Sequence, residues 1–268
     1  MFANARMYSL NPALAEAWRL LLQWVIERAG VDAEVIDYPA PQSLAALWSR
    51  PDMGCAFMCG YPLARAQPQP VVLAAPLPSP ARYGGRPVYC TDLVVRADSA
   101  IATLDAAWGQ RMAFTTTDSM SGHQAPRRFF APFAVARGGK LFAATVGPLV
   151  TPRAVVDALL ARQADIGPLD SYAHDLLRLH EPGLAAQLKV VASTPLAPIP
   201  ALVGAPSIDP AAAQRLSEAL LAVAGAPELA TQRAALLLRG FARIPASDYH
   251  ANMAAADEAD ALGYARLA

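Results

Sequence analysis

The sequence predicts an α/β fold of two lobes, with mixed, mostly parallel sheets and a ligand cleft between the lobes. Short apolar runs alternate with amphipathic helical segments along most of the 268 residues, a pattern typical of βα units. One such series precedes about residue 95, a second follows it, and a proline-rich stretch from residue 195 marks a return of the chain. We therefore expect residues 1–92 and 197–268 to form lobe 1 and residues 93–196 to form lobe 2, with a natural ligand site between them.

The first series begins with an expected strand at residues 2–8 and a helix that starts after Asn11. Asn11 is a good N-cap, Pro12 suits the first helical position, and Gly30 is a typical stop. A second strand is expected at 34–38. The later elements of this series are a short helix at 43–48 and strands at 55–59, 71–75 and 88–95. The run at 55–59 closes on a glycine, which favours a buried parallel strand followed by a loop.

The second series begins with an expected strand at 112–117, which leads into a Ser- and Gly-rich turn and a helix that runs through Phe129. Thr151 and Pro152 repeat the combination of N-cap and proline that starts a helix. Further strands are expected at 141–146, 164–167 and 188–192. After the proline-rich crossing at 195–206, the chain from residue 210 onward is expected to be mostly helical.

Composition excludes several classes of protein. The chain has 22 basic and 22 acidic residues, and its formal net charge of zero lacks the positive excess of nucleic-acid-binding proteins. No apolar run reaches the roughly 18 residues of a membrane span. The three cysteines, Cys55, Cys59 and Cys90, cannot complete a disulfide framework, although one disulfide between two of them remains possible.

The first residues of the sequence lack the basic and apolar regions of a signal peptide. We expect a periplasmic location if an export signal was removed, and a cytoplasmic one otherwise.

The most informative segment is the hydroxyl-rich run at residues 115–123, Thr-Thr-Thr-Asp-Ser-Met-Ser-Gly-His. It lies where a strand passes into a helix, and the first amides of a helix have no intrahelical partner. Together with the hydroxyls of Ser119 and Ser121, those amides can hold an anion without any charged side chain. Gly122 permits a close approach of the ligand. The alternative is ordinary helix capping, which Ser and Asp also serve.

Three tyrosines, Tyr8, Tyr61 and Tyr89, lie at the ends of expected strands. Each combines an apolar ring with a hydroxyl donor, which suits a small organic anion. The alternative for each is a packed aromatic residue in the core or at a hinge.

The remaining polar residues give no sign of catalysis or of a cofactor. No histidine has a metal-ligand spacing, and no GxSxG, P-loop or GxGxxG motif occurs. We expect the histidines to be surface or capping residues, except that His123 lies beside the proposed anion site. Arg127 and Arg128 are expected to be solvated, or else to add positive potential there. Asp165 and Asp170 are the acidic residues placed best to face a cleft, and Asp165 is expected to orient the neighbouring strand.

Several motifs together resemble one protein family. They are Met7-Tyr8 ahead of a helix, Cys-Gly-Tyr-Pro at 59–62, Tyr-Cys-Thr-Asp-Leu-Val-Val-Arg-Ala-Asp at 89–98, Asp-Ser-Met-Ser-Gly at 118–122, Ala-Asp-Ile-Gly-Pro-Leu-Asp at 164–170, and Gly240-Phe241 with Asp248-Tyr249. The chain thereby resembles, over most of its length, the phosphate/phosphonate-type substrate-binding proteins of ABC transporters. These proteins have the type II periplasmic binding protein fold.

The resemblance implies which residues hold the ligand. The anion would be bound by Ser119, the Met120 amide, Ser121 and Gly122, while Tyr89 would line the hinge side and Tyr61 would lie in a loop near the ligand. Pro126 also has a counterpart in the family. Because its ring would clash with the carbonyl of residue 122, we expect a distorted first helical turn.

The resemblance also implies a function, with one departure. It implies a non-enzymatic solute-binding protein that takes a phosphonate, phosphate or sulfonate and docks transiently on an ABC permease, without a cofactor, metal or nucleic acid. Binders of aminophosphonates hold the ligand amine with a histidine and acidic groups, whereas this chain has Pro152, Tyr172 and Ile199 nearest those positions. Two alternatives stay open, a cytoplasmic enzyme on the same fold and a cytoplasmic sensor. The oligomeric state is also left open.

Overall fold

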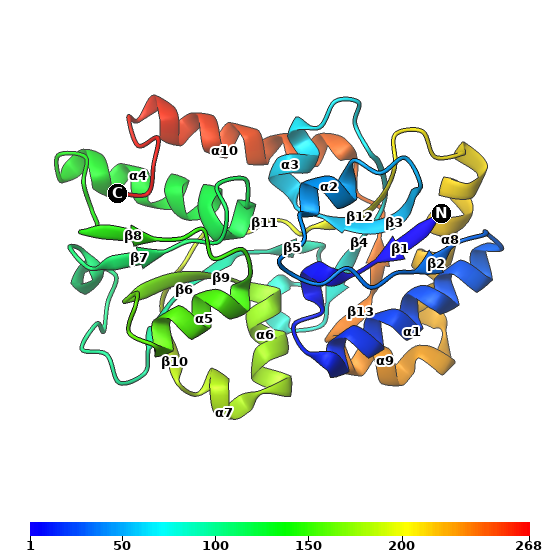
Figure 1. Ribbon diagram of the computed structural model, residues 1–268, viewed down its shortest axis with the longest axis horizontal. Helices are drawn as coiled ribbons and strands as arrows, with labels where there is room; N and C mark the ends of the chain where they lie inside the picture. The colour runs from blue at the N-terminus through cyan, green and yellow to red at the C-terminus, as the bar shows by residue number, and fades with distance from the viewer. The chain divides into compact units, whose positions relative to one another are not determined.

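Each of the two units into which the chain divides contains its own mixed sheet. The computed structural model describes residues 1–268. Unit 1 comprises Met1–Val88 and Pro198–Tyr249, and unit 2 comprises Tyr89–Ala197 and His250–Ala268 (Figure 1). The expectation that all of 197–268 belongs to lobe 1 is therefore corrected for residues 250–268. This segment packs within unit 2 because its apolar side chains join a core cluster there.

The sheet of unit 1 has six strands in the order β13-β4-β12-β3-β1-β2. Their bounds are Phe2–Asn4 (β1), Glu34–Val35 (β2), Met53–Met58 (β3), Val71–Pro78 (β4), Ala201–Gly204 (β12) and Leu238–Ala242 (β13). Strand β1 runs parallel to β2 and β3, whereas β12 is antiparallel to β3 and β4, and β13 is antiparallel to β4. The sheet is mixed, as expected, but it is not mostly parallel, because the strands of the returning chain enter it in the opposite direction.

The helices of unit 1 are Pro12–Ala29 (α1), Leu44–Trp48 (α2), Gly60–Arg65 (α3), Pro210–Ala222 (α8) and Ala230–Ala235 (α9). Helix α1 has the ends that its sequence predicts: the Asn11 side chain accepts a hydrogen bond from the Leu14 amide at 2.9 Å, and Gly30 adopts φ 59°. The Ser217 hydroxyl donates to the Leu73 carbonyl at 2.8 Å and ties α8 to β4. The Trp48 indole donates to the Phe57 carbonyl at 2.9 Å and ties α2 to β3.

Two local expectations for unit 1 are wrong. The first strand stops at Asn4, because the Asn4 side-chain oxygen accepts from the Arg6 amide at 3.0 Å and turns the chain into a short 3₁₀ segment, Arg6–Tyr8. The expected loop after residue 59 is the helix α3. The region after residue 210 is mostly helical, as expected, and it also contains strand β13, which the apolar pattern of the sequence did not reveal.

The sheet of unit 2 has five strands in the order β10-β6-β9-β7-β8. Their bounds are Thr91–Arg96 (β6), Arg111–Ala113 (β7), Ala144–Val146 (β8), Ile166–Asp170 (β9) and Leu188–Ser193 (β10). Strand β7 is parallel to β8 and β9, and β6 is antiparallel to β9 and β10. A separate pair, β5 (Val88–Tyr89) and β11 (Ala197–Pro198), contains the first two points at which the chain passes between the units.

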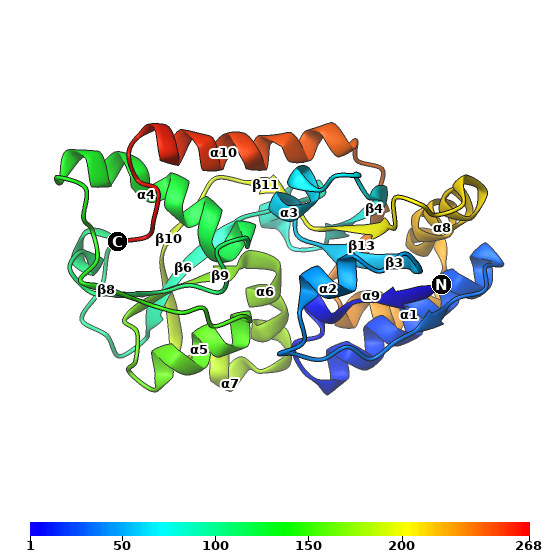
Figure 2. The same ribbon diagram turned by 45° about the horizontal axis from the view of Figure 1, so that its top comes forward.

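Side chains that alternate along β6 supply a core on each face of this sheet. Leu93 and Val95 join the cluster beneath α4 (Ala125–Ala136) and the C-terminal segment, which includes α10 (His250–Ala261). Val94 joins the opposite cluster beneath α5 (Pro152–Leu160), α6 (Ser171–His180) and α7 (Pro182–Ala185). Helix α10 lies beside α4 in both views (Figure 2). Helices α6 and α7 were not expected from the sequence.

The helices are too short or too charged for a lipid bilayer. The one long enough to consider is α1, with 18 residues, and it carries Glu16, Arg19, Glu27 and Arg28. No helix of the structure is long and apolar enough to cross a membrane.

Candidate anion-binding site

The hydroxyl-rich segment of unit 2 forms a wide helical turn between β7 and α4. Residues Met120–Gln124 are π-helical, and the Gln124 amide donates to the Ser119 carbonyl at 3.0 Å, five residues earlier. The Ala125 amide donates to the Met120 carbonyl with the same spacing. The expected distortion of this turn is present, and π-helical turns are frequent at functional sites.

Pro126 explains why the turn is wide and how its carbonyls are satisfied. Proline has no N–H, so it gives no hydrogen bond to Gly122 four residues earlier or to Ser121 five residues earlier. The Thr91 hydroxyl donates to the Ser121 carbonyl at 3.0 Å instead. The Thr115 amide lies 3.4 Å from the Gly122 carbonyl. Partners from β6 and from the segment that follows β7 therefore hold the turn in place.

Gly122 allows two hydroxyls to lie close against its backbone. A Cβ atom at this residue would overlap the Thr115 hydroxyl and would lie 2.9 Å from the Ser119 hydroxyl oxygen. The Ser119 oxygen accepts from the Gly122 amide at 3.0 Å, while the Thr115 hydroxyl is buried without a hydrogen-bond partner. A buried hydroxyl normally has a partner, so the Thr115 hydroxyl is a candidate contact for a ligand.

Two more buried polar groups of the same turn have no partner. They are Nδ1 of His123 and the side-chain oxygen of Gln124, whose amide nitrogen donates to the Thr117 carbonyl at 2.6 Å. Burial and the nearby Arg127 lower the pKa of His123 to about 4, against a smaller opposing effect of Asp118. The imidazole is therefore uncharged at neutral pH, so the turn offers neutral donors and acceptors to a ligand.

The three tyrosines lie in different units. Tyr89 is buried in β5, at the start of unit 2. Tyr8 and Tyr61 belong to unit 1, where they follow the parallel strands β1 and β3 and so lie toward the same edge of its sheet. The Tyr8 ring packs edge-on against Phe57, with centroids 5.0 Å apart. The Tyr61 hydroxyl accepts from Arg65 at 3.3 Å.

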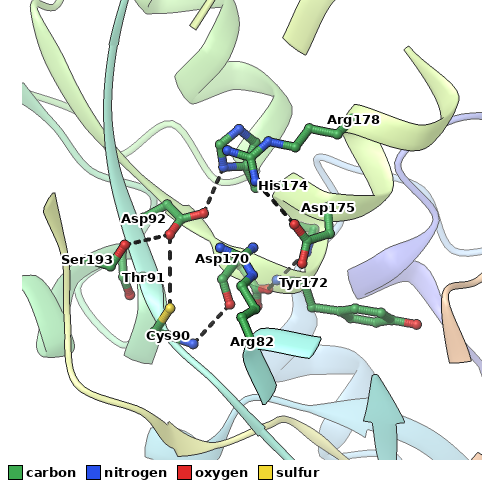
Figure 3. A network of polar contacts seen from close by, with 12 residues as sticks. Arg82, Cys90, Thr91, Asp92, Asp170, Tyr172, His174, Asp175, Arg178 and Ser193 are labelled. Carbon is green, nitrogen blue, oxygen red and sulfur yellow. Dashed lines mark hydrogen bonds and ion pairs between the residues drawn. The ribbon is translucent and has the colours of Figure 1, made fainter. Parts of the chain in front are cut away.

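A buried polar network fixes the start of β6 from the other face of the sheet (Figure 3). One Asp92 carboxylate oxygen lies 2.8 Å from His174 Nδ1, and the other accepts from the Ser193 hydroxyl at 2.8 Å. The expectation that His174 is a surface or capping residue is wrong, because a buried carboxylate needs such a partner. Since Thr91 and Asp92 are neighbours on a strand, their side chains point to opposite faces: Thr91 supports the π-helical turn at Met120–Gln124, while Asp92 is anchored beneath α6.

Other expectations about polar residues have mixed outcomes. Arg127 is buried rather than solvated, while Arg128 is exposed and pairs with Glu258 at 2.5 Å. Asp165 pairs with Arg111 at 2.8 Å and so orients the strand, as expected. Asp170 caps α6 by accepting from the Tyr172 and Ala173 amides.

The sequence did not single out Thr91, Thr115 or Gln124 as site residues. Thr115 belongs to the hydroxyl-rich run, so a local signal for it existed. Thr91 is distant in sequence, and only the order of the strands brings it to the turn.

The structure shows no donor set for a metal ion. No group of three or more His, Cys, Asp or Glu side chains is placed to hold one. Cys55, Cys59 and Cys90 are buried and form no disulfide. Burial raises the pKa of the Cys55 thiol to about 12, so this thiol is unreactive at neutral pH.

One protein family and several solved structures are similar to this chain. A family model for the periplasmic substrate-binding protein of a phosphonate ABC transporter matches residues 9–249. A binding protein component of an ABC phosphonate transporter from Pseudomonas aeruginosa has a TM-score of 0.74 at 18% sequence identity, over 98% of this chain and 96% of that one. The protein PhnD1 from Prochlorococcus marinus, in complex with methylphosphonate, has a TM-score of 0.77 at 15% identity, over 97% and 98% of the two chains.

A third structure extends the range of ligands found among similar folds. A protein from Xanthomonas citri bound to ATP has a TM-score of 0.65 at 18% identity and covers 98% of both chains. At these identities the structures show a common fold, and the match of the family model is the stronger finding. No curated protein matches the chain in sequence.

Proposed function

Because this chain belongs to the family of periplasmic substrate-binding proteins of phosphonate ABC transporters, we propose that its turn at residues 115–124 holds the phosphonate group of the ligand. Proteins of this family bind a small ligand and serve a membrane permease. They are transport proteins rather than enzymes, so the alternative of an enzyme on the same fold is set aside. We propose that the chain acts in the periplasm and passes its ligand to such a permease.

The observation that carries the proposed anion site is the close approach of two hydroxyls to Gly122. The hydroxyls of Thr115 and Ser119 lie on the side of this glycine where a Cβ would stand, and the Thr115 hydroxyl has no partner. The turn continues into α4, so the positive end of the helix dipole adds to these neutral donors. Ser121, Met120 and His123 belong to the same turn and complete the proposed contacts with the anion.

We propose that the ligand carries no ammonium group. Pro152, Tyr172 and Ile199 have no negative charge with which to neutralise one, and burial raises the pKa of the Tyr172 hydroxyl further. The tyrosines Tyr8, Tyr61 and Tyr89 are proposed to contact the organic substituent through ring and hydroxyl. We therefore propose a simple alkylphosphonate as the ligand, of the kind bound to the Prochlorococcus protein.

A ligand panel tests this function by thermal shift and calorimetry. Methylphosphonate is expected to raise the melting temperature, because a ligand that binds only the folded state stabilises it. Inorganic phosphate and methanesulfonate test the other oxyanions, 2-aminoethylphosphonate tests the exclusion of an amine, and ATP tests the likeness to the Xanthomonas protein. If none of these compounds shifts the melting temperature, the proposed function is wrong.

Gly122→Ala tests the place of the anion. The new methyl group would overlap the Thr115 hydroxyl and crowd Ser119, so both hydroxyls must move and the binding of methylphosphonate is expected to weaken by roughly 1.5–3 kcal/mol. Gly183→Ala is the matched control, because a Cβ at residue 183 meets no atom within 4 Å. Equal affinity of the two variants, measured by calorimetry, would move the anion site elsewhere.

A further inference from the structure

The peptide between Ser121 and Gly122 is held at both of its polar groups. The Thr91 hydroxyl donates to the Ser121 carbonyl at 3.0 Å. The Gly122 amide donates to the Ser119 hydroxyl oxygen, also at 3.0 Å. The peptide is trans, so its carbonyl and its N–H point in opposite directions. A partner that fixes the direction of the carbonyl therefore also fixes the direction of the amide.

Thr91 supplies the hydrogen bond that the helix cannot give to the Ser121 carbonyl. In a continuous helix this carbonyl would accept from an amide four or five residues later. The Ala125 amide donates to the Met120 carbonyl instead, and Pro126 has no N–H. Without the Thr91 hydroxyl the carbonyl would lose its partner, and the peptide would no longer be held in one orientation.

Thr91 itself has a fixed position at the start of β6. It is buried, its amide donates to the Thr194 hydroxyl oxygen at 2.9 Å, and its carbonyl accepts from the Thr194 amide at 2.9 Å. The next residue, Asp92, is held by His174 and Ser193 (Figure 3). Threonine is β-branched, so it has few side-chain rotamers on a strand. The hydroxyl therefore reaches the turn from a rigid base.

Ser119 is the residue through which this orientation affects a ligand. Its hydroxyl oxygen accepts from the Gly122 amide, so its own hydrogen remains to be donated. A hydroxyl that accepts a hydrogen bond becomes a better donor, because hydrogen bonds in a chain polarise one another. The charged oxygens of a phosphonate group are strong acceptors for such a donor.

We propose that Thr91 is a positioning residue of the anion site: its hydroxyl fixes the Ser121–Gly122 peptide and directs the Gly122 amide at Ser119, whose hydroxyl then donates to the ligand. This inference rests on the proposed function, because it assigns the turn to ligand binding. Thr91 acts through the peptide and does not touch the ligand. The affinity for a phosphonate therefore depends on a residue of β6 that is distant from the turn in sequence.

Conservative replacements of Thr91 test this role by calorimetry. Thr91→Val keeps the shape of the side chain and removes the hydroxyl, so the affinity for methylphosphonate is expected to fall roughly tenfold, about the effect of one hydrogen bond. Thr91→Ser keeps the hydroxyl and is expected to retain an affinity close to that of the wild type. If Thr91→Val does not fold, Thr91→Ala replaces it with the same expected loss.

Ser217→Ala is the matched control for these variants. It removes another buried bond from a hydroxyl to a carbonyl, the one to Leu73 in unit 1, and should leave the affinity unchanged. Full affinity in a folded Thr91→Val would overturn the proposal, as would an equal loss in Ser217→Ala.

A double-mutant cycle with Ser119→Ala tests the route of the effect. If Thr91 acts through Ser119, Thr91→Val should weaken binding much less in the Ser119→Ala background than in the wild type. Losses that multiply would show that the two residues act independently and would overturn the proposal.

Hydrogen exchange of the Gly122 amide gives a readout that needs no ligand. Its NMR signal is assigned by its loss in Gly122→Ala, and its exchange reports on the bond to Ser119. In Thr91→Val this exchange is expected to accelerate roughly tenfold, while the Phe130 amide of α4 exchanges as in the wild type. Unchanged exchange at Gly122, or equal acceleration at both amides, would contradict a specific hold on the peptide.

The binding and exchange measurements separate this inference from the proposed function. A Gly122 amide that responds to Thr91→Val in a protein that binds no oxyanion would refute the proposed function, while it would confirm that Thr91 orients the peptide. Methylphosphonate binding that is equally tight in the wild type and in a folded Thr91→Val would refute the inference alone.

Discussion

At the scale of single residues, a glycine and a histidine define the chemistry of the turn that we propose binds the anion, residues 115–124. Gly122 supplies space, and His123 supplies a ring nitrogen whose charge is suppressed by burial and by Arg127. Neither effect needs a cluster of basic side chains. A neutral chain can therefore bind an anion through hydroxyls, amides and one uncharged imidazole.

His123 also makes the stability of the protein depend on pH. Its pKa in the folded protein is about 4, below the ordinary value of 6.5, so between these values the unfolded chain binds a proton that the folded chain does not. The free energy of unfolding should therefore fall as the pH drops from 6.5 to 4, by on the order of 2 kcal/mol for this group, since it keeps some access to solvent. Urea unfolding at pH 7, 5.5 and 4 should show a smaller loss in His123→Gln than in the wild type.

The control for this measurement is His250→Gln, at an exposed position of the C-terminal helix. That variant should follow the wild-type pH profile. Parallel profiles for His123→Gln and the wild type would contradict the assignment of an uncharged imidazole.

The π-helical turn is the decisive structure at the scale of elements. Pro126 withdraws an amide from the turn, and partners from outside the helix take the freed carbonyls. In Pro126→Ala the new amide can bond within the helix, so the turn should tighten toward α-helical geometry. We expect the affinity for methylphosphonate to fall roughly tenfold, about the value of one hydrogen bond, while the melting temperature stays equal or rises.

Pro132→Ala is the matched control, since Pro132 lies exposed inside α4. Removal of this proline should raise stability and leave the affinity for methylphosphonate unchanged, as measured by calorimetry. If both variants keep full affinity, the width of the turn does not matter for binding.

The attachment of the C-terminal segment is the main feature at the scale of the whole molecule. Leu267 is 5% exposed within the core of unit 2, whereas Leu262 is 47% exposed. Leu267→Ala should lower the free energy of unfolding of unit 2 by about 2–4 kcal/mol, and Leu262→Ala should change it by less than about 0.5 kcal/mol. Hydrogen exchange in α4 should accelerate only in the first variant. Faster exchange confined to unit 1 would instead restore residues 250–268 to lobe 1.

Local interactions that the sequence specifies determined several structural features of this protein. Asn11 with Pro12, Thr151 with Pro152 and the glycine at residue 30 act on their own neighbours, so the helix ends they predict are the observed ones. The family motifs likewise identified the fold and the transport function. The hydroxyl-rich run of residues 115–123 and the effect of the Pro126 ring on the helix could also be recognised from the sequence, because both act within one turn.

Only the tertiary structure decided which distant groups meet that turn. Thr91 reaches Ser121 because of the order of the strands, Asp92 meets His174 through the packing of α6, and Arg127 is buried because the C-terminal segment covers it. Whether a side chain is buried or charged depends on its surroundings, and those surroundings are formed by elements far apart in the chain. For this reason the sequence was enough to propose a segment for anion binding, while the fold decided the charge, the partners and the accessibility of its side chains.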